Sequence, residues 1–143
     1  MTRELFKAAS YLALIIDNKI LLSRRYNTTW SDGKYSLPSG HVESGETFTQ
    51  ALIREAFEEI DIIIEEKDLE VLHIMHRPLV YYVDVFFTTY KYKGEIKNKE
   101  LDKCDDLKWF SLNNLPENIV PSVKYFIENY INGKKYSEFL INE

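Results

Sequence analysis

The sequence predicts a single α/β domain, and three observations support this class. Short apolar and β-branched runs alternate with two segments of helical periodicity, as in a mixed α/β fold. The chain has 143 residues, enough for one domain with a substantial core. It contains no internal repeat, low-complexity tract or linker that would divide it. We therefore expect one domain over residues 1–143.

The N-terminal part of the chain is predicted to form strands. Two apolar runs, residues 8–16 and 19–25, flank Asp17-Asn18, a pair that favours a two-residue hairpin turn. Residues 26–34 are polar and contain Gly, which predicts an exposed loop. A short strand over residues 35–37 follows.

A helix is predicted to begin after Thr47 and to end at Ile60. Thr47 is followed three residues later by Gln50, which is the form of a capping box. Asp61 stands where helices often end in a left-handed residue, a conformation that Gly prefers and Asp tolerates. On a helical projection, an apolar arc expected to pack on the sheet is formed by Ile53, Ala56, Phe57 and Ile60.

The second half of the chain is predicted to contain three strands and a second helix. Residues 69–76 and 80–92 are rich in β-branched and aromatic residues, and residues 107–111 form a shorter run. Pro121 opens the helix and Gly133 ends it, which is the usual punctuation of helix termini.

Composition and charge narrow the functional class. Eighteen Lys and Arg against 23 Asp and Glu give a net charge of −5, so no general basic field exists to hold long nucleic acid. The single cysteine, Cys104, cannot form an internal disulfide or a cysteine-based zinc site. Residues 1–16 lack the cleavage site of a signal peptide, and no apolar stretch reaches the roughly 18 residues of a membrane span. We expect a cytoplasmic protein that does not bind membranes.

Three carboxylates crowd one side of the first predicted helix. With Glu55 as reference, Glu59 lies about 40° to one side and Glu58 about 60° to the other, opposite the apolar arc. Like-charge neighbours at this spacing each cost on the order of a few tenths of a kcal/mol. A hard divalent cation would reverse that cost, whereas the alternative is a solvated charged face.

The spacing around these carboxylates is highly specific. It runs from Gly40 through five residues to Glu46, then seven residues to Arg54-Glu55, and on through Glu58-Glu59 to Ile62. This segment, residues 40–62, resembles the Nudix box at six of its seven fixed positions, a match expected by chance about once in 10⁷ starting points. Asp61 replaces the last Gly of that pattern. The resemblance continues through residues 37–46 and 109–116.

The resemblance implies a fold, a reaction and a metal site. Nudix proteins have an α/β/α sandwich with a central mixed sheet, and they hydrolyse nucleoside diphosphates linked to another moiety. It implies Mg²⁺, or Mn²⁺, as cofactor, with Arg54 orienting the glutamates and paired with Glu46. The implied metal ligands are the carboxylates of Glu55, Glu58 and Glu59 and the carbonyl of Gly40.

The general base is left open by the sequence. Nudix relatives use either a box glutamate, here Glu58, or an acid from a later loop, here Glu100. Asp102, Asp105 and Asp106 follow in the same acidic segment, which is also typical of a solvated loop.

Candidate substrate contacts are fewer and less specific. Arg24 and Arg25 end a predicted strand and point to opposite faces, so we expect at most one to meet phosphates. Tyr35 is a candidate for stacking on a base. Further aromatic candidates are Trp30, Tyr81 and Tyr82.

A small nucleotide is the expected substrate and partner, with the chain a monomer or homodimer. The short chain favours a (d)NTP or a similar compound. Pro78 matches a weak positional marker of ADP-ribose-hydrolysing relatives, so ADP-ribose or a nucleotide sugar is the alternative. A non-catalytic binding module of the same fold usually loses box glutamates, and this chain keeps them. An isoprenyl diphosphate isomerase would need a thiol in its site, and nothing places Cys104 there.

Overall fold

The computed structural model describes residues 2–143. None of the helices within that range is long and apolar enough to cross a membrane. The elements in chain order are β1 (Lys7–Leu12), β2 (Ile15–Ile16), β3 (Lys19–Arg25), β4 (Tyr35–Ser36), β5 (Ser39–His41), α1 (Phe48–Ile60), a 3₁₀ turn (Glu66–Asp68), β6 (Leu69–Arg77), β7 (Tyr82–Thr89), β8 (Cys104–Ser111), α2 (Pro121–Ile131) and β9 (Tyr136–Glu138).

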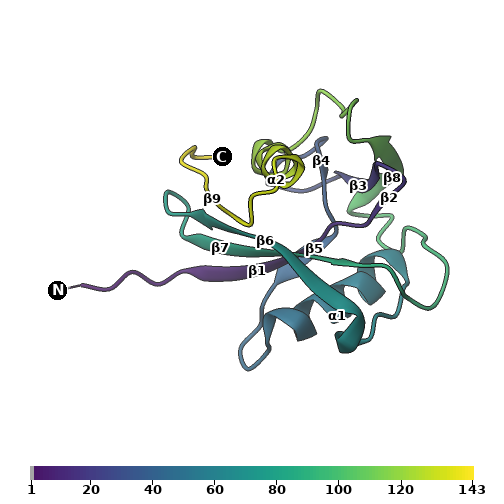
Figure 1. Cartoon of the computed structure of the whole chain (residues 1–143), viewed down its shortest axis with the longest axis horizontal. Helices are drawn as coiled ribbons and strands as arrows, with labels where there is room; N and C mark the ends of the chain where they lie inside the picture. The colour runs from purple at the N-terminus through teal and green to yellow at the C-terminus, as the bar shows by residue number, and fades with distance from the viewer. Residues whose placement is uncertain (1) are drawn as a thin grey trace.

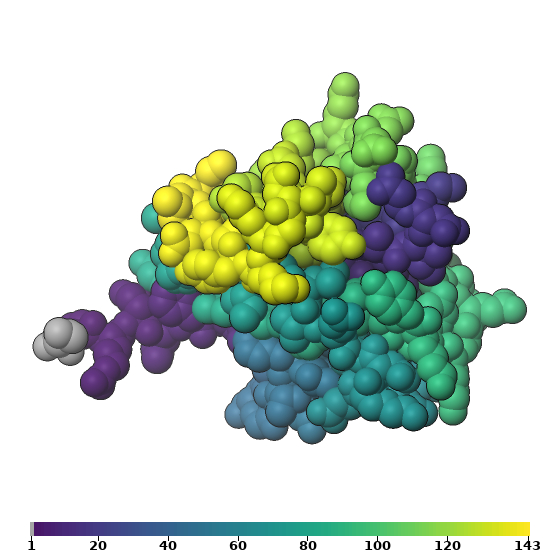
Figure 2. Space-filling model, viewed as in Figure 1, coloured from purple at the N-terminus to yellow at the C-terminus, as the bar shows by residue number. Residues whose placement is uncertain are grey.

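A mixed five-stranded sheet forms the centre of the molecule. Its order is β5-β1-β7-β6-β9, with β1 parallel to β7, β9 parallel to β6 and the other pairs antiparallel. Helix α1 lies against one face and α2 against the other (Figure 1). Figure 2 shows the yellow C-terminal segment above the sheet and the blue-to-teal α1 region below it. The expected α/β/α sandwich is confirmed.

A second, smaller sheet continues from the first. It contains β2, β3 and β4, with β8 paired to the other edge of β3. The chain crosses between the sheets at Ala13 and Leu14. The Ala13 N–H donates to the Phe87 carbonyl of β7, whereas the Leu14 carbonyl accepts from Leu21 of β3. This crossing divides the run over residues 8–16, which was predicted as one strand, into β1 and β2.

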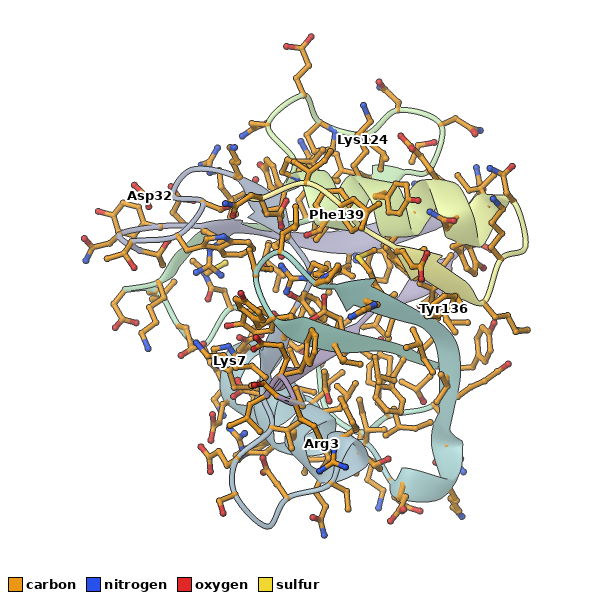
Figure 3. All side chains as sticks on the ribbon, turned by 90° about the vertical axis from the view of Figure 1, so that its left-hand side faces the viewer. Arg3, Lys7, Asp32, Lys124, Tyr136 and Phe139 are labelled. Carbon is orange, nitrogen blue, oxygen red and sulfur yellow. The ribbon has the colours of Figure 1, made fainter. Side chains whose placement is uncertain are left out.

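Two apolar clusters fill the faces of the central sheet. Because successive strand residues point to opposite faces, Tyr11 joins the cluster under α2 while Leu12 joins the cluster under α1. In the first cluster, the rings of Phe86 and Phe126 stack with their centres 4.0 Å apart. Figure 3 shows Phe139, which follows β9, on the same side as α2.

Several local predictions are confirmed at the residue level. Asp17 and Asn18 both adopt left-handed backbone angles, with φ of 51° and 60°, as a two-residue hairpin turn requires. The hydroxyl of Thr47 accepts the Gln50 N–H at 3.0 Å, and Gln50 reciprocates, completing the capping box. Asp61 ends α1 in the left-handed region with φ 64°.

Other bounds differ from the predictions. Strand β7 is shorter than the expected residues 80–92, because residues 78–81 form the turn after β6. Strand β8 begins three residues before the expected residue 107. Strands β5 and β9 were not predicted, since each has three residues and owes its conformation to pairing with a distant strand.

His73 fastens β9 and the segment before it to β6. Its ring is fully buried, with Nδ1 2.8 Å from the Lys134 carbonyl oxygen and Nε2 2.7 Å from Ser137 Oγ. Burial lowers the pKa of His73, so the unfolded chain takes up this proton at a higher pH than the folded protein. The His73 contribution to stability is therefore complete above the unfolded-state pKa of about 6.5 and is lost as pH falls below it.

We expect the melting temperature to fall between about pH 7.5 and pH 5.5, and to fall less in His73→Gln, which has no such proton to bind. Thermal unfolding at both pH values measures this difference. His76→Gln is the matched control, because His76 is on the same strand but only partly buried. Equal pH dependence in wild type and His73→Gln would refute the assignment.

Candidate active site

The face of helix α1 that packs on the sheet differs from the predicted one. Its buried residues are Ala51, Leu52, Ala56 and Ile60. Phe57, expected in the packed arc, is 46% exposed, so that part of the prediction is wrong. The buried face is rotated by roughly a quarter of a turn about the helix axis. As a result, Glu55 and Glu59 face inward, and Glu58 alone of the three is exposed.

Gly40 and Glu55 are in direct contact. A Cβ atom at Gly40 would lie 2.2 Å from Cδ of Glu55, a distance that real side chains do not tolerate. Strand β5 therefore needs glycine here so that the Glu55 carboxylate can lie against its backbone. Two residues that the Nudix resemblance assigned to one metal site are thus brought together.

Arg54 joins the carboxylates of α1 to the loop before it. Its Nε donates to Glu46 Oε2 at 2.8 Å, and its Nη1 donates to Glu55 Oε1 at 2.6 Å. Nη1 also lies 3.5 Å from Glu58 Oε2. The hydrogen bonds from Arg54, followed by that from the Glu43 N–H, lower the pKa of Glu46 to about 2. The pairing of Arg54 with Glu46 is as the resemblance implied.

Glu59 carries the most perturbed carboxylate of the helix. Its Oε2 accepts the Ser39 N–H at 2.9 Å. Burial raises the pKa of Glu59 well above its ordinary value, and the nearby charges of Glu55 and Glu100 raise it further. Burial also raises the pKa of Glu55, against the opposing effect of Arg54. A half-buried carboxylate that lines a cavity is suited to a bound cation.

The donor set fits a hard divalent cation, although its side chains are not gathered. Within residues 2–143, no three His, Cys, Asp or Glu side chains stand close enough together to hold a metal ion. The reason is local: Glu55 is engaged by Arg54, and Glu58 points outward with 52% of its side chain exposed. Carboxylate and carbonyl oxygens are nevertheless the ligands that Mg²⁺ and Mn²⁺ prefer.

Two cavities meet beside these carboxylates. The smaller, of about 100 Å³, is lined by Glu59 and Glu100, and the larger, of about 550 Å³, by Gly40 and Glu55. Residues that line both are Arg25, Ser39 and Lys103. Arg25 and Lys103 therefore place two cations on both cavities. Glu59 lines only the smaller cavity and Glu55 only the larger.

Arg25 is the better placed of the two predicted arginines. Its Nε donates to the Trp30 carbonyl at 2.7 Å, and its guanidinium lies 4.7 Å from the centre of the Trp30 ring. Arg24 lines only the smaller cavity, and its Nε is bonded to Asp105 Oδ1 at 2.7 Å. Figure 3 labels Asp32 at the outer end of the loop that carries Trp30.

The predicted aromatic contacts are divided between the cleft and the core. Trp30 and Tyr82 line the larger cavity. Tyr35 is only 6% exposed, packs against Phe110 and lines neither cavity, so we withdraw it as a substrate contact. Its hydroxyl donates to Asp106. Burial, followed by this hydrogen bond, raises the pKa of Tyr35 to about 12.

Among the acids of the later loop, Glu100 is the one beside Glu59. Asp105 is paired with Arg24, and Asp106 accepts the Tyr35 hydroxyl. Sequence reasoning missed Lys103, Arg77 and Glu143, which also line the larger cavity. No local motif marks these residues, because they reach the cleft only through the pairing of β6 with β9 and the turn after Glu100.

The whole arrangement is similar to proteins of one family. A family model described as the NUDIX domain matches residues 6–130. The crystal structure of the MutT NUDIX hydrolase from Burkholderia pseudomallei superposes with a TM-score of 0.78 and 26% identity, covering 87% of this chain and 98% of that one.

Two sequence relatives carry more specific names. An ADP-ribose pyrophosphatase of Methanocaldococcus jannaschii is 36% identical over 103 residues, which are 71% of this chain and 59% of the relative. A NAD-capped RNA hydrolase NudC of Pseudomonas aeruginosa is 33% identical over 99 residues, 69% of this chain and 34% of the relative. The chain thus spans about three fifths of the first relative and about one third of the second.

Proposed function

The chain belongs to the Nudix family, and from that premise we propose that it hydrolyses the diphosphate linkage of a small nucleoside diphosphate derivative. The observation that supports this proposal is that Glu59 lines one cavity, Glu55 and Gly40 line the other, and the two cavities share lining residues.

We propose Mg²⁺ as the cofactor, with Mn²⁺ able to replace it. The carboxylates of Glu55, Glu58 and Glu59 and the carbonyl of Gly40 would hold it. When bound, the cation neutralises diphosphate charge and lowers the pKa of the attacking water.

The protein's own residues would supply binding and proton transfer. Arg25 and Lys103 would bind the phosphates, and Trp30 would contact the base. Water oxygen attacks one phosphorus, the bridging P–O bond breaks, and two phosphate monoesters leave. Glu100 would accept the proton of the attacking water, and Glu58 is the alternative base.

The names of the relatives favour one class of substrate. ADP-ribose and NAD each carry a group on both sides of the diphosphate, and the larger cavity, of about 550 Å³, is lined by Glu55. We therefore place ADP-ribose and other nucleoside diphosphates substituted on both sides, such as NADH, ahead of the (d)NTP expected from chain length.

A phosphatase-coupled screen tests this function. ADP-ribose, NADH, nucleotide sugars and (d)NTPs are incubated with the protein and Mg²⁺ or Mn²⁺, and released phosphate monoesters are measured. We expect the highest turnover with ADP-ribose or NADH. If only (d)NTPs are hydrolysed, the substrates are nucleoside triphosphates, as chain length suggested. Binding of a nucleotide without hydrolysis of any would make the protein a binding module.

Metal addition is expected to stabilise the fold. Glu55 and Glu59 each line a cavity, and burial raises the pKa of both. A cation should therefore bind the folded chain in preference to the unfolded one. Millimolar Mg²⁺ or Mn²⁺ should raise the melting temperature, and EDTA should reverse the change. Glu66→Gln, an acid remote from the cleft, serves as a control that keeps the shift. A melting temperature indifferent to metal would indicate a solvated charged face.

A further inference from the structure

The connection between β7 and β8 is fastened to the end of α1. The Lys99 N–H donates to the Glu59 carbonyl at 3.0 Å, and the Lys97 N–H donates to the Ile60 carbonyl at 3.1 Å. Carbonyls in the last turn of a helix have no partner within the helix, so this connection satisfies them. Its path beside α1 is visible in Figure 1, and in Figure 2 its green surface adjoins the blue-to-teal region.

Asp61 adds side-chain contacts to the same connection. Its Oδ1 lies 3.2 Å from Lys99 Nζ, and its Oδ2 lies 3.6 Å from Lys97 Nζ. Lys99 Nζ also lies 3.7 Å from the centre of the Phe57 ring. The Gly that usually occupies the Asp61 position could adopt the same backbone conformation, but it could not make these ion pairs.

Glu100 follows Lys99 directly and is held in a closed turn. Asn98 Oδ1 accepts the Glu100 N–H at 2.9 Å, and Asn98 Nδ2 donates to the Cys104 carbonyl at 2.6 Å. The Glu100 carbonyl accepts the N–H groups of Lys103 and Cys104. This turn directs Glu100 to the small cavity that Glu59 also lines.

We propose that Asp61 and Lys99 are positioning residues that hold Glu100 beside Glu59. Asp61 fixes the Lys99 side chain, the Lys99 backbone is bonded to Glu59 itself, and Glu100 is the next residue along the chain. Contacts with the C-terminal end of α1 thereby determine how far Glu100 lies from Glu59. The inference rests on the proposed function, in which Glu100 accepts the proton.

Kinetics of Asp61→Gly and Lys99→Met test the proposal. Asp61→Gly keeps the left-handed backbone, so the fold is retained. Because a displacement of about 1 Å can cost roughly 10²-fold in rate, we expect kcat to fall about 10- to 10²-fold with KM nearly unchanged. Lys99→Arg should retain most of the kcat that Lys99→Met loses, since Arg keeps the ion pair. Lys93→Met is the control with wild-type kcat, because Lys93 reaches only the exposed Glu65.

A double-mutant cycle separates positioning from general weakening of the fold. Adding Asp61→Gly to Glu100→Gln should lower kcat by less than about twofold, because the residue being positioned is already inactive. A full additional loss in the double variant would overturn the proposal. If Glu100→Gln has the kcat of the wild type, Glu100 is not the base and the positioning proposal is overturned. The proposed hydrolase function is unaffected by that result as long as the wild type hydrolyses a substrate.

A third measurement does not use activity. In the metal-free protein, amide hydrogen exchange at Lys99 and Glu100 should be faster in Asp61→Gly than in wild type, whereas Lys93→Met should leave it unchanged. Unchanged exchange at both amides in Asp61→Gly would show that the ion pairs do not hold the connection, and would overturn the proposal.

Discussion

Replacing Glu59 by Gln should abolish nearly all hydrolysis and raise the melting temperature of the metal-free protein. Activity is lost because the amide is a poor ligand for a hard cation. Stability rises because an enclosed carboxylate with a raised pKa opposes folding above the ordinary Glu pKa of about 4.3, where the unfolded chain gives up the proton and the folded one retains it. Gln keeps an acceptor for the Ser39 N–H.

The sign of this effect gives it a pH signature. The gain in melting temperature should be present at neutral pH, and should vanish as pH falls well below about 4, where the carboxyl is protonated in both states. Thermal unfolding in EDTA at several pH values measures it. Glu58→Gln is the matched control, because Glu58 is exposed and its replacement should not raise stability. More than about a tenth of wild-type turnover in Glu59→Gln would refute the metal site.

The second large effect is expected at Glu100. General-base catalysis contributes typically ~10²–10⁴-fold, so Glu100→Gln should lower kcat by that factor with little change in metal affinity. The reason is geometric: Glu100 lines the cavity beside Glu59 from another segment, whereas Glu58 would share its oxygens with the cation. Steady-state kinetics with a Mn²⁺ titration measure both quantities.

Two further variants complete that comparison. Asp102→Asn should change kcat and metal affinity little. Asp102 is an exposed acid in the same segment and lines neither the smaller nor the larger cavity. Glu58→Gln should weaken both turnover and metal binding. If Glu100→Gln is mild while Glu58→Gln is severe in both measurements, the base is Glu58.

Local signals in the sequence were sufficient for the elements that carry the site. The pairing of Thr47 with Gln50 marks the start of α1, and Asp61 marks its end with a conformation that few residues adopt. The two-residue turn at Asp17-Asn18 is equally local. Each of these features depends on neighbours within four residues, which is why spacing alone predicts them.

The orientation of α1 could not be predicted in the same way. Apolar periodicity placed Phe57 inside and all three glutamates outside, whereas the sheet instead receives Ala51 and Leu52, and Glu59 is enclosed. The contacts that accompany this orientation are tertiary: the Ser39 N–H donates to Glu59, and the Lys99 ammonium lies over the Phe57 ring. Tertiary contacts thus override the simple hydrophobic pattern.

The cleft itself also depended on contacts between distant segments. Lys103 reaches the cavities through a turn whose N–H groups bond Glu100, and Arg25 turns toward Trp30 next to a register shift in the pairing of β3 with β8. Tyr35, a reasonable stacking candidate by residue type, is instead used in the core. Residue type alone does not distinguish these outcomes.

Binding of Mn²⁺ to wild type and Glu59→Gln, followed by electron paramagnetic resonance of the free ion, tests the central claim most directly. We expect the wild type to bind Mn²⁺ and Mg²⁺ to displace it, with Glu59→Gln losing at least about 10-fold in affinity, the loss typical when metal-site carboxylates or their supports are removed. Equal affinity in the two proteins, or no binding by the wild type in the presence of a nucleoside diphosphate derivative, would contradict the claim that the inward face of α1 holds the catalytic cation.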